Sequence, residues 1–197
     1  MGRSGTTLLQ QLISNTHKLT NLGEYITFDT TRQSSIDSLT KLDNWVVKFF
    51  VECNDYNIDS YIDDIDMLSP TMIINSYRKD KFDQYLSFQI SLNNNKWNAD
   101  TKLKYTPFVL NDIEKKIEYF VNSLKLNDEI LLKLKEKYNV IDVSYEDILS
   151  NNLHDDLKIK FDQSKSTLVK QNTLDEKISL IKNIEDVKIY WDNIVKW

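Results

Sequence analysis

The chain has 197 residues, of which 25 are basic and 30 acidic, so that its formal net charge is −5, and 41% of the residues are hydrophobic. This composition is typical of one folded domain spanning 1–197, and it excludes a disordered tail and a disulfide-stapled miniprotein. The acidic excess disfavours a nucleic acid or an anionic membrane surface as the main partner.

The single cysteine, Cys53, has no second cysteine with which to form an intrachain disulfide. This favours a reducing compartment, and a structural role for Cys53 is preferred over a catalytic thiol. No stretch approaches the roughly 18 consecutive apolar residues of a membrane-spanning helix, and the first residues lack the layout of a signal peptide. We therefore predict a cytoplasmic protein without a membrane segment.

Apolar residues at helical spacing predict an amphipathic helix from Gly5 to about Asn15. Apolar runs rich in β-branched and aromatic residues predict buried strands at 45–51, 71–77 and 139–144. Further helices are expected at about 81–92, 110–124, 128–138 (with Asn127 as its cap) and 146–161. Strands that alternate with helices predict an α/β fold with a central parallel sheet covered on both faces.

The most informative segment is the loop Arg3-Ser4-Gly5-Thr6-Thr7, which leads directly into the first predicted helix. Glycine permits close backbone approach, amide groups point outward at a helix start, hydroxyl groups add donors, and Arg3 supplies a bidentate cation. This arrangement suits a phosphate group. The alternative is an N-terminal segment that merely caps its helix.

The same residues, continuing into Leu8-Leu9, resemble the phosphosulfate-binding loop of the sulfotransferases. The resemblance implies a P-loop-like α/β/α fold in three layers and the sulfonate donor 3′-phosphoadenosine-5′-phosphosulfate. It also implies that Arg3 and the amides of Ser4, Gly5, Thr6 and Thr7 hold the donor's 5′-phosphate and bridging oxygen. The Gly-Lys-Ser/Thr ending of the nucleotide triphosphatases is absent here, which disfavours the rival interpretation, a P-loop kinase.

Other segments resemble the family in the expected chain order. After the strand predicted at 71–77, Arg78 and Lys79 are followed by Ser87, similar to a 3′-phosphate site in which an Arg precedes a Ser by eight residues. Strict spacing selects Lys79, but Arg78 is adjacent and alone has the planar fork, so both stay candidates. Lys170 lies in a stretch similar to a basic loop that closes over the same phosphate, and a solvated surface lysine is its alternative.

Leu22-Gly23-Glu24-Tyr25 resembles the element in which several sulfotransferases carry their catalytic base. Sulfonate transfer needs a base near the acceptor and cations near the departing oxygen, so we assign Glu24 as the base and Arg3 as a catalytic cation. A surface glutamate is the alternative, and the histidines His17 and His154 fit a base less well by position. Lys48, within an apolar strand, either faces the transferred sulfonate or extends to the surface.

Val143-Ser144-Tyr145-Glu146-Asp147 resembles a strand-to-helix segment of the family, and we assign it a structural role. The segments 26–42 and 54–69, with Tyr61 and Asp59 among their polar residues, are expected to line the acceptor, a small molecule or carbohydrate. No metal-ligand pattern is found. Because a phosphate loop normally follows a central strand, we expect such a strand to be missing before Arg3. A sulfotransferase-like module that binds nucleotide without catalysis is a further alternative.

Overall fold

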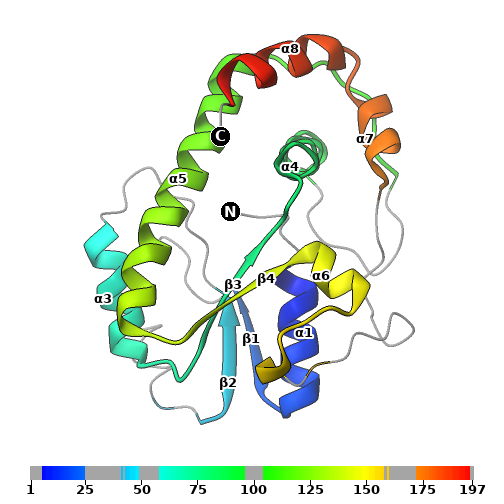
Figure 1. Ribbon diagram of the computed structural model, residues 1–197. Helices are drawn as coiled ribbons and strands as arrows, with labels where there is room; N and C mark the ends of the chain where they lie inside the picture. Colours follow the sequence, from blue (N-terminus) through cyan, green and yellow to red (C-terminus); the bar gives the residue numbers. More distant parts are fainter. Residues whose placement is uncertain are drawn as a thin grey trace. The chain divides into compact units, whose positions relative to one another are not determined.

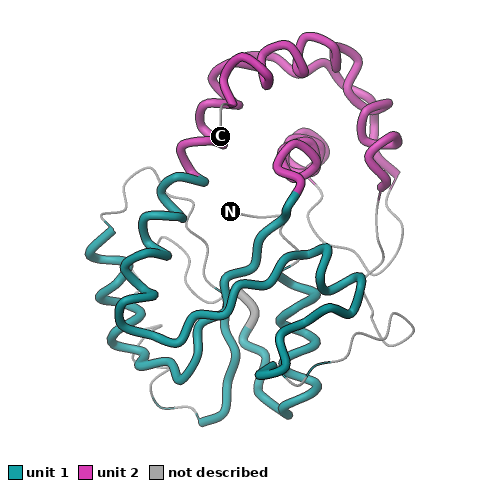
Figure 2. Tube along the Cα trace, in the orientation of Figure 1, with its two compact units in different colours: residues 1–79, 124–161 teal, residues 80–123, 162–197 magenta. Residues whose placement is uncertain are grey.

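The structure is a computed structural model that describes residues 6–24, 41, 43–48, 58–95, 104–157, 159 and 172–195. This part of the chain is mixed α/β, mostly helical, with parallel strand pairs (Figure 1). The chain divides into two compact units, one formed by residues 1–79 and 124–161 and the other by residues 80–123 and 162–197 (Figure 2).

The first unit begins with helix α1, Thr6–His17, which confirms the predicted helix and extends it by two residues. Leu8, Leu9 and Ile13 lie on its buried face. The helix is followed by Lys18, whose φ of 55° is left-handed. Glycine usually occupies such a position, but the three glycines of this chain lie elsewhere in the sequence.

Strand β1, Thr20–Glu24, was not predicted, and it pairs in parallel with β2, Trp45–Lys48. The sequence Thr-Asn-Leu-Gly-Glu has little strand propensity, so the pairing with the apolar β2 determines its conformation. The prediction of a strand at 45–51 is confirmed for 45–48, and residues 49–51 lie outside the described part.

Strands β3, Ile73–Tyr77, and β4, Val140–Ser144, form a second parallel pair with an uninterrupted register from Ile73 opposite Val140 to Tyr77 opposite Ser144. Both confirm strands predicted from their β-branched runs. The strands that the structure describes thus form two sheets of two strands each, and α1 contacts β1, β2 and β3. The α/β class and parallel pairing are confirmed, whereas the expected three-layer arrangement around one sheet is not.

Helix α5, Ile113–Lys137, runs without interruption for 25 residues. The helical conformation predicted at 110–124 and 128–138 is confirmed, but the break between the two segments was wrong, and Asn127 lies inside the helix rather than capping it. No Gly or Pro stands between the two segments, and the apolar repeat continues through Leu124 to Ile130 and Leu134, so packing outweighs the modest helix propensity of Asn and Asp.

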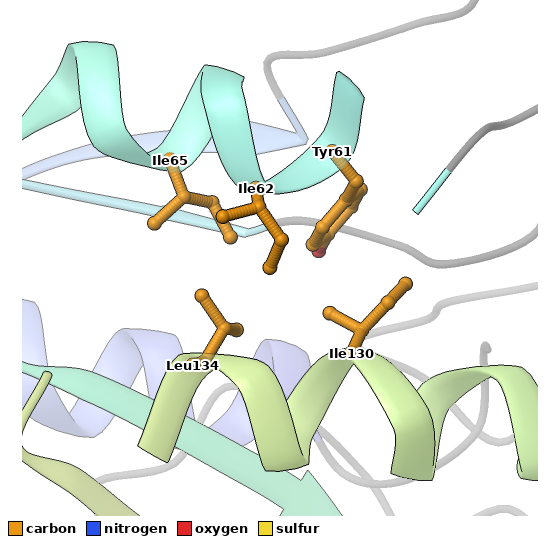
Figure 3. Packing of buried hydrophobic residues seen from close by; sticks show 5 residues of the cluster. All are labelled: Tyr61, Ile62, Ile65, Ile130 and Leu134. Atoms are coloured by element: carbon orange, nitrogen blue, oxygen red, sulfur yellow. The ribbon is translucent and has the colours of Figure 1, made fainter. Parts of the chain in front are cut away.

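Helix α3, Ile58–Leu68, which was not predicted, contributes with α5 to a core cluster of the first unit. Figure 3 shows its side chains projecting from the two helices toward each other, and its members are Tyr61, Ile62, Ile65, Ile130 and Leu134. Ion pairs flank the cluster, because Lys133 Nζ lies 2.7 Å from Asp59 Oδ1 and Lys137 Nζ 2.7 Å from Asp66 Oδ2.

Helix α6, Tyr145–Ser150, is much shorter than the helix predicted to reach residue 161. Ser144 caps its start by accepting a hydrogen bond from the amide of Asp147, and Asn151, with φ 57°, ends it in the left-handed conformation. A short 3₁₀ helix, η1, follows at Asp155–Leu157. The Asn-Asn pair at 151–152 is the stop signal that apolar periodicity alone overlooked.

In the second unit, α4, Lys81–Asn94, confirms the helix predicted at 81–92. Asp80 caps its start, accepting from the amide of Asp83, and Asn95 ends it with φ 49°. Helices α7, Leu174–Leu180, and α8, Ile184–Ile194, were not predicted. Thr173 and Glu176 form a capping box at the start of α7, a sequence signature that marks this helix.

The core of the second unit is aromatic. Tyr85 of α4 is fully buried, and its ring centroid lies 5.3 Å from those of Phe120 and Trp191. Lys177 Nζ of α7 forms a hydrogen-bonded ion pair with Asp83 Oδ1 of α4, and both groups are largely buried. These contacts connect α4 to α5, α7 and α8 within this unit.

Candidate active site

Three of the residues considered in the sequence gather at the carboxyl end of the first sheet. Lys48 is the last residue of β2, and its Cα partner across the parallel pair is Glu24, the last residue of β1. The side chain of Lys48 is only 6% exposed, and its Nζ donates a hydrogen bond of 2.9 Å to Thr7 Oγ1 in the first turn of α1. Lys48 thus connects the two other positions: its backbone is paired with that of Glu24, and its side chain contacts Thr7.

The contact between α1 and β2 is reinforced two residues before Lys48. Gln10, which is buried, donates from Nε2 to the carbonyl oxygen of Val46 at 3.4 Å. Because Gln10 and Thr7 lie one helical turn apart, the two hydrogen bonds align the start of α1 with the end of β2. Lys48 therefore does not extend to the surface: its ammonium group is directed toward the first turn of α1.

Gly23 occupies an irregularity that brings Glu24 into line with Lys48. Asn21 is paired with Val46, and Glu24 is paired with Lys48. Between these two pairs, β1 contains one residue more than β2. An extra residue bends a strand locally, and glycine is favoured at such positions. The Gly-Glu element thus has a local structural basis in the register that sets the Glu24 backbone opposite Lys48.

The basic pair after β3 has two contrasting environments. Arg78 is 8% exposed, and its guanidinium carbon lies 4.4 Å from the centroid of the Tyr145 ring. Lys79 has a 55% exposed side chain whose Nζ donates to Asp147 Oδ1 at 2.7 Å, and its backbone amide donates to Glu146 Oε2 at 3.1 Å. The hydrogen bond to Asp147 raises the pKa of Lys79, and the same contact lowers the pKa of Asp147.

Ser87 belongs to the second unit, where it lies in the middle of α4 and is 3% exposed. Its Oγ is a buried atom without a hydrogen-bond partner in the described part of the chain. Buried hydroxyl groups are nearly always hydrogen-bonded, so this oxygen can accommodate a partner from outside the described residues.

Thr6 is half-buried at the start of α1. Four other predicted site residues fall outside the described part, namely Arg3, Ser4, Gly5 and Lys170, and so does Cys53.

Other residues considered in the sequence analysis make contacts that hold the fold together. His17 and His154 are exposed, as expected, and His17 Nε2 donates to the carbonyl oxygen of Leu157 at 2.8 Å. Tyr61, expected to line the acceptor, is instead buried in the cluster between α3 and α5. Asp59, from the same predicted segment, pairs with Lys133. Periodicity would have identified both, because 58–68 carries an amphipathic helical pattern.

Comparison of the chain with protein-family models, with curated proteins and with solved structures gave no match. None of the described helices is long and apolar enough to cross a membrane. Across the described ranges there is also no group of three or more His, Cys, Asp or Glu side chains arranged to hold a metal ion.

The geometry of the first unit defines what this site can do chemically. The parallel strands β1 and β2 end at Glu24 and Lys48, and Thr7 lies in the first turn of α1 beside Lys48. A cation and a helix N-terminus, both of which stabilise an anion, therefore meet at this edge of the sheet. Sequence reasoning gave the segment that contains Tyr145 a structural role and missed the contact of its ring with Arg78. The signal for this contact was the position of Tyr145 directly after β4, which is paired with the strand that precedes Arg78.

Proposed function

We propose that this chain is a sulfotransferase, which transfers a sulfonate group from 3′-phosphoadenosine-5′-phosphosulfate to a hydroxyl or amine of an acceptor such as a carbohydrate. The observation that carries the proposal is the hydrogen bond from the buried Lys48 ammonium group to Thr7 at the start of α1, beside the end of β1 at Glu24. The resemblance of the segment from Arg3 to Thr7 to a phosphosulfate loop supports a role for the same helix start in binding the donor.

Cations of the first unit fit a donor that carries more than one anionic group. Lys48 and the first turn of α1 suit an anion, since a cation and outward amide groups meet there. Arg78 of the same unit is a buried planar cation, which suits a phosphate group. The donor supplies a sulfur atom bonded to a good leaving group, the bridging phosphate oxygen.

In the proposed reaction, the acceptor oxygen forms a bond to sulfur while the bond from sulfur to the bridging oxygen breaks, and the leaving bisphosphate keeps that electron pair. Glu24 takes the proton of the acceptor. Arg3, Lys48 and the amides at the start of α1 stabilise the negative charge that develops on the bridging oxygen. Thr7 fixes the direction of the Lys48 ammonium group, which a flexible lysine otherwise lacks.

Calorimetric titration with adenosine 3′,5′-bisphosphate and, separately, with ATP and Mg²⁺ tests the ligand class without knowledge of the acceptor. We expect the bisphosphate to bind at least tenfold more tightly than ATP. A preference for ATP would contradict the proposal and favour a phosphotransferase. Transfer of labelled sulfonate to a panel of phenols, sugars and amines then tests catalysis, and a protein that binds the bisphosphate without turnover would be a binding module.

Matched variants test the roles of individual residues in any detected transfer. Lys48→Met is expected to lower the rate roughly 100-fold, since it removes one group that stabilises developing charge. Lys41→Met, at an exposed position before β2, is its control. Glu24→Gln removes the base, with Asp43→Asn as the control at another exposed site. Unchanged rates in Lys48→Met and Glu24→Gln would refute the assigned mechanism.

A further inference from the structure

Helix α4 carries a polar row on one of its faces, formed by Gln84, Ser87 and Ser91. These residues are three and four positions apart, so successive members lie about one helical turn apart on the same side of the helix. Their exposed fractions are 2%, 3% and 1%. The polar row is therefore as deeply buried as Tyr85, which lies on another side of α4 and packs against aromatic rings.

The polar row contains three buried oxygen atoms that have no hydrogen-bond partner among the described residues. They are Gln84 Oε1, Ser87 Oγ and Ser91 Oγ. A polar atom that leaves water on folding and gains no partner destabilises the folded state, and native proteins pair nearly all such atoms. Three of them on one helix face indicate partners that lie beside this face.

The two serines of the polar row differ from other helical serines of this chain. A serine hydroxyl in a helix can donate to the backbone carbonyl three or four residues before it. Ser14 makes this bond although it is only 7% exposed, so burial does not prevent it. The hydroxyl groups of Ser87 and Ser91 make no such bond and remain available to a partner beside α4. Four helical serines make the bond at 2.8–3.0 Å: Ser14, Ser123, Ser150 and Ser179.

The chemistry of the polar row limits what this partner is. The unpaired atom of Gln84 is an amide oxygen, which only accepts hydrogen bonds, whereas a serine hydroxyl both donates and accepts. Cβ atoms three or four positions apart on a helix are about 5–6 Å from each other, and one group with hydrogen bonds of about 2.8 Å to two neighbours spans that distance. A water molecule has this size, donates and accepts, and brings no charge to the buried face.

We propose that ordered water molecules bind along the polar row, one between Gln84 and Ser87 and one between Ser87 and Ser91. The first donates to the Gln84 oxygen, and both are held by the Ser87 hydroxyl. This water supplies the hydrogen bonds that the buried polar face of α4 needs, so the helix is buried on a hydrated face as well as on its aromatic one. The inference is independent of the proposed function.

A crystal structure of the full chain, at a resolution that shows water, tests the positions directly. We expect single-atom electron density within hydrogen-bond distance of Ser87 Oγ and of Gln84 Oε1 or Ser91 Oγ. Absence of such density would overturn the proposal, as would serine hydroxyls that donate to the carbonyls one turn before them. Density of a larger molecule would show a bound solute in place of water and would also overturn it.

Unfolding in denaturant gives a second readout, whose sign separates the two possibilities. If water is bound, Ser87→Ala removes one of its partners, and we expect the equilibrium constant for unfolding to rise about fivefold. If the hydroxyl is buried without a partner, its removal relieves a desolvation cost and the constant falls, which would contradict the proposal. The control is Ser123→Ala on α5, whose hydroxyl bonds its own helix, with an expected change below about threefold.

A double-mutant cycle tests whether Gln84 and Ser87 share one water molecule. Gln84→Met keeps the length of the side chain and removes the accepting oxygen. Because either substitution already disrupts the shared water, we expect the double variant to raise the unfolding constant less than the product of the two single effects. Single effects that multiply fully would show that the two side chains act independently, and the proposed bridge would be wrong.

Discussion

Replacement of Leu134 by alanine tests the continuous helix α5 and its packing on α3. Leu134 is 5% exposed and belongs to the cluster with Tyr61, Ile62, Ile65 and Ile130. The substitution removes about three methylene-sized groups at roughly 0.8 kcal/mol each, or about 2.4 kcal/mol, and the remaining cavity adds to this cost. We therefore expect the free energy of unfolding to fall by about 3 kcal/mol.

Urea denaturation followed by circular dichroism measures this loss, and a protein of this length should also melt about 6–12 °C lower. The matched control is Leu132→Ala on the same helix, because Leu132 is 67% exposed. We expect the control to change the free energy by no more than about 0.5 kcal/mol. Equal effects of the two substitutions, or a loss below about 1 kcal/mol for Leu134→Ala, would refute the packing of these two helices.

Two further predictions concern the first unit. Partial burial and the hydrogen bond to Asp66 raise the pKa of Tyr138 to about 12, so the folded state favours the neutral phenol. The resulting stabilisation is complete below about pH 10, and it is lost as the pH rises from about 10 to about 12. Spectrophotometric titration of the parent minus Tyr138→Phe should show this midpoint, Asp66→Asn should lower it, and a midpoint near 10 in the parent would contradict the contact. Lys18→Gly should stabilise the protein by about 1 kcal/mol, because φ of 55° disfavours a residue with a Cβ, whereas Lys18→Ala keeps the Cβ and should bring no such gain in chemical denaturation.

The strands β3 and β4 were predictable because their own residues favour the strand conformation. Both β3 and β4 are short runs with isoleucine or valine at successive positions, and β-branched residues favour the strand conformation. Strand β1 has no such pattern: Asn21 and Gly23 oppose it, and the strand exists because β2 pairs with it. A conformation determined by a partner 25 residues away along the chain, Thr20 with Trp45, cannot be found from local propensity.

Two helix boundaries were predicted wrongly: a break was expected inside α5, and the end of α6 was missed. The Asn-Asp pair at 127–128 suggested a break in α5, but the apolar repeat on either side packs against α3 on one stretch and reaches Phe120 on the other, and that burial outweighs the pair. At Asn151, by contrast, a similar residue does end a helix, since it takes the left-handed conformation there. The same residue type thus has opposite outcomes, and only the packing around it separates them.

The candidate site was predictable in its parts rather than in its contacts. Glu24, Thr7 and Lys48 were each identified from the sequence, but their convergence depends on a parallel pairing and on one extra residue at Gly23. Tyr145 was assigned to the fold because its neighbours cap a helix, and they do. Its contact with Arg78 arises from the level at which β3 and β4 end, which is a property of the register and not of either segment alone.

Lys48 and Arg78 are both buried cations at the carboxyl ends of strands, in a chain whose formal net charge is −5. Lys48 ends β2, Arg78 directly follows β3, and each is more than nine-tenths buried. Burial of a cation is costly, and it is tolerated where hydrogen bonds or an opposite charge compensate for lost water. The printed contacts of these cations are a hydroxyl group at Lys48 and an aromatic face at Arg78, whereas Lys79 contacts a carboxylate. An anionic ligand that binds at these strand ends should stabilise the folded first unit, and the gain should rise with the logarithm of the ligand concentration once the ligand exceeds its Kd.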